Sequence, residues 1–217
     1  MDARTVVVTN SKPQMSDYQY SWSFTDAIAK NNINYIFGKY GVPSTMIEIG
    51  TFEGGTAFHI SDSYSRFVET MQIYCIDPHD TSDDLSDDLN QVHQRFVHNL
   101  GVCNNKNIEY IRKYSMDGMI DLVNRKVTAQ FIYVDGDHKG STVLSDLVMA
   151  FHLLEVGGVI LCDDTNWKHP ADSGIPDSPS MTPRMAVENF IQCNWHRLNV
   201  LDLPNGGSQT AFVKTSV

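Results

Sequence analysis

The chain has 217 residues, of which 41% are hydrophobic and 19% charged, and its formal net charge is −10 at pH 7. This length suits one α/β domain with a substantial core, and the excess of acid argues against DNA or RNA as a partner. No apolar run approaches the ~18 residues of a membrane span, and no charged-then-apolar leader opens the chain. We therefore expect a cytoplasmic protein without a membrane partner.

The first half of the chain predicts helices alternating with short apolar strands. A polar arm over residues 1–20 precedes a helix over 22–40, which Gly41 ends. Strands are expected at 45–50, 72–77 and 108–111, and helices at 56–67, from about 89 to 100, and at 116–124. In the helix from 89 the core spacing leaves His93 and His98 at the surface.

The second half continues the alternation and ends in a hairpin. We expect strands at 130–134 and 159–162, with a helix over 141–155 that Gly157-Gly158 stops. The Pro-rich stretch 165–183 predicts a lid loop, with Trp167 and His169 near its start. A helix over 184–193 and strands at 196–203 and 210–214 close the chain. The whole pattern predicts a single domain over 1–217, with one doubly wound, mostly parallel sheet and a C-terminal antiparallel hairpin.

A glycine-containing loop, Glu48-Ile49-Gly50-Thr51-Phe52-Glu53-Gly54-Gly55, links the first strand to its helix. Glycines there let a ligand approach the backbone, and the helix amino end offers free N–H groups. Glu48 argues against a diphosphate and favours a cationic or zwitterionic ligand. Asp77 ends the second strand, where a carboxylate accepts ribose hydroxyls, although its spacing alone also fits an NAD site.

Acidic residues follow two further strands. Asp135, Asp137 and His138 follow one, and Asp163 and Asp164 follow the next. Ligands bind at the carboxyl ends of parallel strands, so these side chains are expected to converge. Such a cluster is costly without a cation, and carboxylates without a neighbouring cysteine favour Mg²⁺ first, then Ca²⁺ or Mn²⁺. Helix capping by the same acids is the alternative.

With these motifs the chain resembles the class I S-adenosylmethionine-dependent methyltransferases over roughly residues 40–217. The matching segments are the glycine loop, Ile76-Asp77, Tyr114-Ser115-Met116-Asp117 and the closing hairpin. The resemblance implies a Rossmann-like fold and S-adenosylmethionine as cofactor. Around that cofactor it places Glu48, Gly50, Thr51 and Gly54 at the methionine moiety, Asp77 at the ribose, Ser115 and Met116 at the adenine, and Asp135 beside them.

Within that class the acidic cluster is similar to the metal-dependent O-methyltransferases of the catechol, caffeoyl-coenzyme A and macrocin-type sugar groups. This similarity implies a metal held by Asp135, Asp163 and Asp164, and a base at Asp137 or, second, at His138. The expected reaction is magnesium-dependent O-methylation of a small hydroxylated acceptor, either a sugar or glycoside or a catechol-like molecule. The alternatives are a metal-independent methyltransferase, a non-catalytic S-adenosylmethionine-binding protein and, less favoured, an NAD-dependent oxidoreductase.

Overall fold

The computed structural model describes residues 13–21, 27–80, 89–167, 182–205 and 207–217. Its strands form one sheet in the order β3-β2-β1-β4-β5-β7-β6. Their bounds are β1 Thr45–Ile49, β2 Gln72–Ile76, β3 Ile108–Ile111, β4 Ala129–Val134, β5 Leu154–Cys162, β6 Leu198–Val200 and β7 Thr210–Lys214. The first five are parallel, and β7 pairs antiparallel with both β5 and β6. The predicted doubly wound sheet with a C-terminal hairpin is confirmed.

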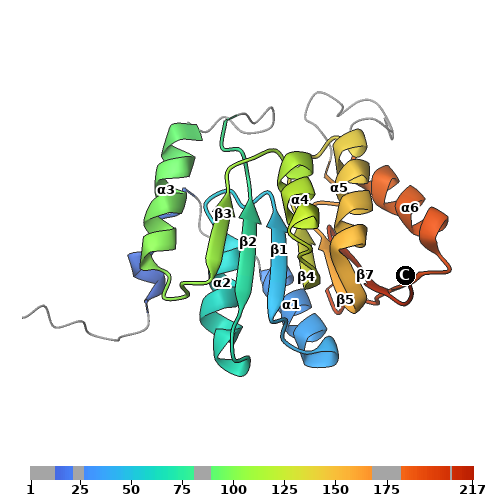
Figure 1. The fold of residues 1–217 in the computed structure, drawn as a ribbon, viewed down its shortest axis with the longest axis horizontal. Helices are drawn as coiled ribbons and strands as arrows, with labels where there is room; N and C mark the ends of the chain where they lie inside the picture. Colours follow the sequence, from blue (N-terminus) through green and yellow to red (C-terminus); the bar gives the residue numbers. More distant parts are fainter. Residues whose placement is uncertain (1–12, 22–26, 81–88, 168–181, 206) are drawn as a thin grey trace, which may run out of the picture.

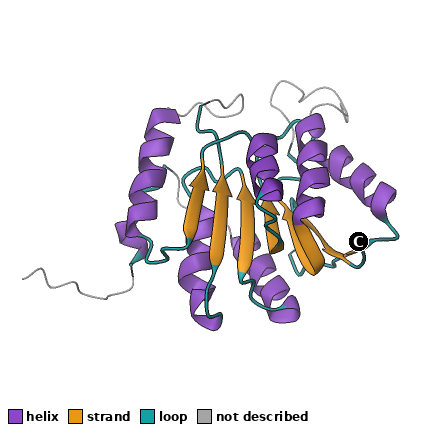
Figure 2. Ribbon diagram, in the orientation of Figure 1, coloured by secondary structure: helices purple, strands orange, loops and turns teal. Residues whose placement is uncertain are grey.

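Helices cover both faces of the sheet (Figures 1 and 2). Helices α4, α5 and α6 pack on one face, and α1, α2 and α3 pack on the other. Their bounds are α1 Ala27–Tyr40, α2 Gly55–Tyr64, α3 Leu89–Val102, α4 Ser115–Asn124, α5 Gly140–Leu153 and α6 Pro183–Asn194, with short 3₁₀ turns at Met15–Asp17 and Ser65–Phe67. Among the described residues, no helix is long and apolar enough to cross a membrane.

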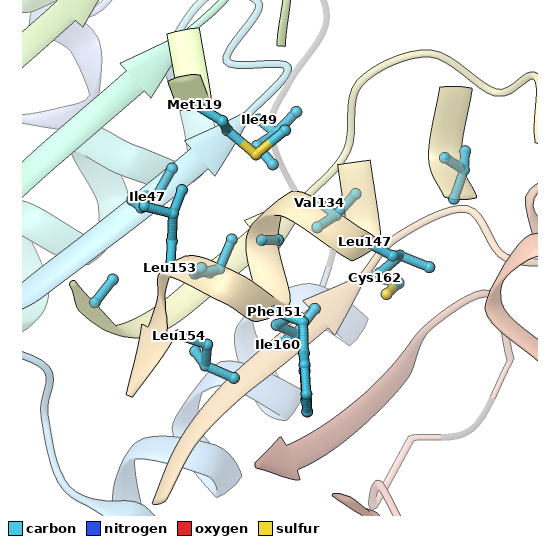
Figure 3. Close-up of a cluster of buried hydrophobic side chains, with 14 of the residues drawn as sticks. Ile47, Ile49, Met119, Val134, Leu147, Phe151, Leu153, Leu154, Ile160 and Cys162 are labelled. Atoms are coloured by element: carbon cyan, nitrogen blue, oxygen red, sulfur yellow. The ribbon is translucent and has the colours of Figure 1, made fainter. Parts of the chain in front are cut away.

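The central strands are buried on both sides, which explains why they are continuous apolar runs in the sequence. On one side, Ile47 and Ile49 of β1 lie in a cluster with Met119 of α4 and Leu147 and Phe151 of α5 (Figure 3). The alternate residue Met46 faces the other layer, where it joins the cluster of α1 and α2. Both layers together fix the strand ends that carry the candidate site.

Two predicted element boundaries are wrong. Helix α5 ends at Leu153, and Gly157-Gly158 lie inside β5 rather than at the end of the helix. Gly157 has φ +89°, and a Cβ on Gly158 would lie 3.0 Å from the Gln130 carbonyl oxygen. The glycines therefore accommodate a bulge, seen as a register shift between Ala129 and Phe131 of β4. The first closing strand, expected over 196–203, is limited to β6.

Part of the predicted amino-terminal arm lies against the sheet's second helical layer. The backbone N–H of Gln19 donates to Asn99 Oδ1 (2.7 Å), and Asn99 Nδ2 donates to the Gln19 carbonyl (2.8 Å). The Ser21 N–H donates to Glu53 Oε2 (2.8 Å), so residues 13–21 contact both α3 and the glycine loop. Residues 1–12 of the arm, and 168–181 of the predicted lid loop with His169, lie outside the described residues.

Candidate active site

The glycine loop lies directly against the end of β4. Gly50 has φ +80°, and a Cβ there would overlap the Asp135 carbonyl group and come within 2.5 Å of Gly136 Cα. Gly54 also has a left-handed backbone, at φ +83°, and is the N-cap of α2. Only glycine fits at position 50 without displacing the backbone that follows β4. The loop that follows β1 is thereby held next to the acids that follow β4.

Glu48, in β1, holds this loop through a hydrogen bond with Thr51. Its side chain is 1% exposed and accepts a hydrogen bond from Thr51 Oγ1 at 2.5 Å. Burial raises the pKa of Glu48 to about 8, against the opposing effect of the Thr51 hydrogen bond. The proposed interaction of Glu48 with a cationic ligand stays a prediction, since the carboxyl is enclosed by its own loop.

Asp77, at the end of β2, organises two loops. Its Oδ2 accepts the Phe52 N–H at 2.8 Å, and its Oδ1 accepts the His79 N–H at 2.9 Å. The side chain is 15% exposed, so it reaches the surface beside the glycine loop. A carboxylate oxygen can accept more than one hydrogen bond, so the role of Asp77 at a ribose stays a prediction.

The two residues predicted at the adenine lie at the start of α4. The first turn of this helix packs on the end of β2, because a Cβ on Gly118 would meet Ile76 at 2.6 Å. Met116 is 37% exposed. The Ser115 hydroxyl hydrogen-bonds to Asp146 of α5. Ser115 and Met116 thus lie at the same edge of the sheet as Asp77.

A compact group of candidate metal ligands lies after β4 and β5. One ligand atom each from Asp135, His138 and Asp164 lies within 4.8 Å of the others. His138 Nε2 is 3.4 Å from Asp164 Oδ2, and the His138 ring stacks on Trp167 with centroids 4.5 Å apart. Asp164 has φ +48°, a left-handed conformation that is uncommon outside glycine. Two of the three predicted metal residues therefore lie together, joined by His138.

Asp163 and Asp137 make other contacts. Asp163 accepts hydrogen bonds from the Tyr133 hydroxyl and from Gln209 Nε2 (2.9 Å), and its Oδ1 accepts the Asp164 N–H (2.8 Å). Burial raises the pKa of Asp163. Asp137 Oδ1 accepts the Lys139 N–H at 3.3 Å, at the amino end of α5. Among the described residues, neither acid belongs to the compact group of candidate ligands.

Several residues at this edge were not predicted from the sequence. Tyr133 of β4 and Gln209, the residue before β7, contact Asp163. Both are distant from Asp163 in the sequence, so no local pattern indicated these contacts. Asp146 had a signal: it lies between Val143 and Leu147 on the inward face of α5, a core position that an acid rarely occupies. His79, buried after β2, was also missed.

Comparisons with known proteins bear on this geometry. A protein-family model described as a methyltransferase domain matches residues 47–165, more than half of the chain. A comparison with curated protein sequences found no match.

Solved structures show the same fold at low sequence identity. An O-methyltransferase from Bacillus cereus in complex with SAH is 17% identical, with a TM-score of 0.59 over 86% of this chain and 81% of that one. TomG from Streptomyces achromogenes, in complex with SAM, is 15% identical, with a TM-score of 0.60 over 87% of this chain and 80% of that one. MycE from the mycinamycin biosynthetic pathway, in complex with Mg, SAH and mycinamycin VI, is 16% identical, with a TM-score of 0.59 over 90% of this chain and 51% of that one.

The family match spans β1 to the start of the segment after β5, which contains both the glycine loop and the acidic cluster. The similar structures confirm the expected sheet topology. The chain belongs to the methyltransferase domain family and has the fold of the class I S-adenosylmethionine-dependent methyltransferases, as its motifs predict.

Proposed function

We propose that this methyltransferase transfers a methyl group from S-adenosylmethionine to a hydroxyl oxygen of a small molecule, with a divalent cation at the acidic cluster. The observation that carries the proposal is the compact group of Asp135, His138 and Asp164. Gly50 contacts the Asp135 backbone, so this group lies next to the loop proposed for the methyl donor. Donor and acceptor would therefore meet over the ends of β1, β4 and β5.

The cofactor assignment rests on three loops at one sheet edge. Glu48, Gly50, Thr51 and Gly54 shape the first loop, Asp77 ends β2, and Ser115 with Met116 begins α4. An extended cofactor with a charged end, a ribose and a base requires contacts of these three kinds in this order. The structures of the B. cereus enzyme and TomG, which share the fold, contain SAH and SAM respectively.

The cation assignment rests on the donor atoms. The carboxylates of Asp135 and Asp164 fit a divalent cation, and Mg²⁺ is preferred for oxygen ligands. In this assignment His138 is the base and not a ligand. Asp163 would add a third carboxylate if its side chain left Tyr133 and Gln209. When bound, the cation would supply Lewis acidity that lowers the pKa of an acceptor hydroxyl. The MycE structure, which has the same fold, contains Mg.

The base is better supplied by His138 than by Asp137. His138 Nε2 lies 3.4 Å from Asp164, inside the compact group, whereas Asp137 accepts a backbone N–H of α5. Trp167 fixes the plane of the His138 ring by stacking. In this proposal the imidazole takes the hydroxyl proton, the oxygen forms a bond to the methyl carbon, and the carbon–sulfur bond breaks to leave the thioether.

A metal-independent methyltransferase is the second candidate, and one observation favours it. The His138–Asp164 pair already has the form of an imidazole oriented by a carboxylate, which acts as a general base without a cation. The predicted acceptor, a sugar or glycoside or a catechol-like molecule, is the same in both cases. The two candidates differ only in whether turnover requires a cation.

The test is methyl transfer from labelled S-adenosylmethionine to a panel of sugars, catechols and glycosylated metabolites, with Mg²⁺ or with excess chelator. We expect an O-methyl ether that forms only with the cation. Asp164→Asn and His138→Gln should abolish transfer, while Glu188→Gln, at an exposed acid of α6, should not. Full turnover in chelator would support the metal-independent candidate, and methylation at nitrogen or carbon would contradict the proposal.

A further inference from the structure

His79 connects three elements around the glycine loop. It follows β2, is 4% exposed and has a left-handed backbone, with φ +46°. It contacts Phe52, which is also left-handed, with φ +47°. Its ring packs against Phe96 of α3 and Tyr110 of β3 with centroids 5.3 Å away in each case. A buried imidazole at a strained backbone position is unusual for a residue that only fills space.

The hydrogen bonds of His79 indicate which ring nitrogen carries the hydrogen in the neutral tautomer. Nε2 lies 2.6 Å from the Phe52 carbonyl oxygen, which only accepts, so Nε2 carries the hydrogen. Nδ1 of the neutral ring is therefore an acceptor, and the Tyr110 hydroxyl donates to it at 2.6 Å. The ring is in this way held between the glycine loop and β3.

His93 of α3 extends the same chain of hydrogen bonds, although the sequence placed it at the surface. Its Nδ1 lies 3.2 Å from His79 Nδ1, and its Nε2 lies 3.5 Å from Arg112 Nη1. Arg112 donates, so His93 accepts at Nε2 and carries its hydrogen on Nδ1, directed to His79. Arg112, His93, His79 and Phe52 thus form a consistent chain of hydrogen bonds while the His93 imidazole is neutral.

The result is that both backbone polar groups of Phe52 are held by the loop after β2. Asp77 accepts the Phe52 N–H, and His79 donates to the Phe52 carbonyl. Phe52 lies between Gly50 and Gly54, so this clamp sets the path of the loop assigned to the methyl donor. His79 also donates its own N–H to Asp77 (2.9 Å), the residue assigned to the ribose.

We propose that His79 is a positioning residue for the cofactor, and that proton uptake by His93, its partner in the His79–His93 pair, disturbs the loop after β2 and weakens cofactor binding. A proton added at His93 Nε2 would remove the acceptor of Arg112 and place a second cation beside it, and Arg112 also donates to the Pro78 carbonyl of that loop (3.2 Å). The inference rests on the proposed cofactor position.

Other ionisable groups surround the pair. Asp77 lies on the β2 side, Tyr110 and Arg112 lie on the β3 side, and Arg95 of α3 is paired with Glu53. Partial burial, Arg112 and His79 lower the pKa of His93 below the ordinary value of 6.5, while Asp77 opposes this. We therefore expect cofactor affinity to fall as the pH drops below about 6.5.

The experiment measures S-adenosylhomocysteine binding to the full chain by calorimetry, without metal, between about pH 5 and about pH 8.5. For the wild type we expect the Kd to rise about tenfold towards the acid end. His93→Gln removes the titrating imidazole and keeps a side chain that can donate to His79 Nδ1. Its Kd should then stay nearly constant over this range.

Two further variants separate positioning from general damage. His79→Asn tolerates the left-handed backbone but does not reach Phe52, so its Kd should be raised across the range, with a flatter profile and a larger effect on KM for the donor than on kcat. His98→Gln is the matched control for His93→Gln, because it removes another histidine of α3, which contacts the Asp17 carbonyl and not the glycine loop. It should leave the profile unchanged.

A pH profile of His93→Gln that matches the wild type would overturn the inference. Glu48, with its pKa raised to about 8 by burial, also titrates beside the loop, and a profile set by Glu48 would persist in His93→Gln. Binding that does not depend on pH, with methyl transfer intact, would refute this inference alone. Absence of binding at every pH would remove the cofactor position and the proposed function together.

Discussion

Asp146 allows the energetic effect of a buried carboxyl in this fold to be measured. The residue is 1% exposed in α5, and its Oδ1 has no hydrogen-bond partner among the described residues. Burial raises the pKa of Asp146 from 3.8 to about 7, against the hydrogen bond from Ser115, and the nearby Asp137 adds to the rise. The folded chain therefore favours the neutral carboxyl.

Because the folded-state pKa is the higher one, Asp146 contributes to stability below pH 3.8 and loses this contribution as the pH rises through about 7. A separation of about three pH units corresponds to about 4 kcal/mol, of which about 3 kcal/mol falls between about pH 5 and about pH 8.5. Asp146→Asn keeps the size of the side chain and removes its ionisation. The free energy of unfolding of this variant, relative to wild type, should therefore rise by about 3 kcal/mol over that range.

The measurement is urea unfolding of both proteins at the two pH values, followed by circular dichroism. The comparison cancels other titrating groups, including Glu48, because they are present in both proteins. Asp121→Asn, at an exposed acid of α4, is the matched control and should show no such pH-dependent difference. A difference between Asp146→Asn and wild type that is the same at both pH values would show that Asp146 ionises like an exposed acid.

Two backbone contacts give further predictions. Gly50→Ala should lower the free energy of unfolding by about 3 kcal/mol and abolish S-adenosylhomocysteine binding, because the added Cβ would displace Asp135. Gly38→Ala is the control: its added Cβ meets nothing within 4 Å, so it should not lower the melting temperature. Lys214→Met should lower the free energy of unfolding, measured with urea, by about 2 kcal/mol. The reason is that Lys214 Nζ donates to the Phe151 carbonyl (2.9 Å) and the Leu154 carbonyl (2.7 Å) at the end of α5. An unchanged midpoint would contradict this capping role.

The sheet was predictable because buried parallel strands are apolar runs that end in polar residues, as β1 and β4 do. The glycines in β5 were misassigned because a β-bulge and a helix end both require glycine, and only the register with β4 distinguishes them. The acids after β4 and β5 were predicted to converge, and Asp135 and Asp164 do. Their individual contacts depend on partners distant in sequence, such as Gln209, which no local pattern reveals.

Backbone strain concentrates where the candidate site lies. Among the described residues, four that are not glycine have positive φ, and three of them, Phe52, His79 and Asp164, lie at the carboxyl ends of β1, β2 and β5. In each case an acid beside the residue accepts its N–H: Asp77 does so for Phe52 and His79, and Asp163 does so for Asp164. Asp163 thus holds the backbone at Asp164 in the acidic cluster, as Asp77 holds the backbone at Phe52 in the glycine loop.

Two roles are open to Asp163, which the sequence does not distinguish: it positions Asp164, or it is itself a metal ligand. If Asp163 only positions Asp164, Asp163→Asn should keep most of the affinity for Mn²⁺, because the amide oxygen still accepts the Asp164 N–H, while Asp163→Ala should lose it. If Asp163 is itself a ligand, both variants should weaken binding about equally, by tenfold or more. Mn²⁺ titration followed by electron paramagnetic resonance measures this without turnover, and from the contacts with Tyr133 and Gln209 we expect the first result.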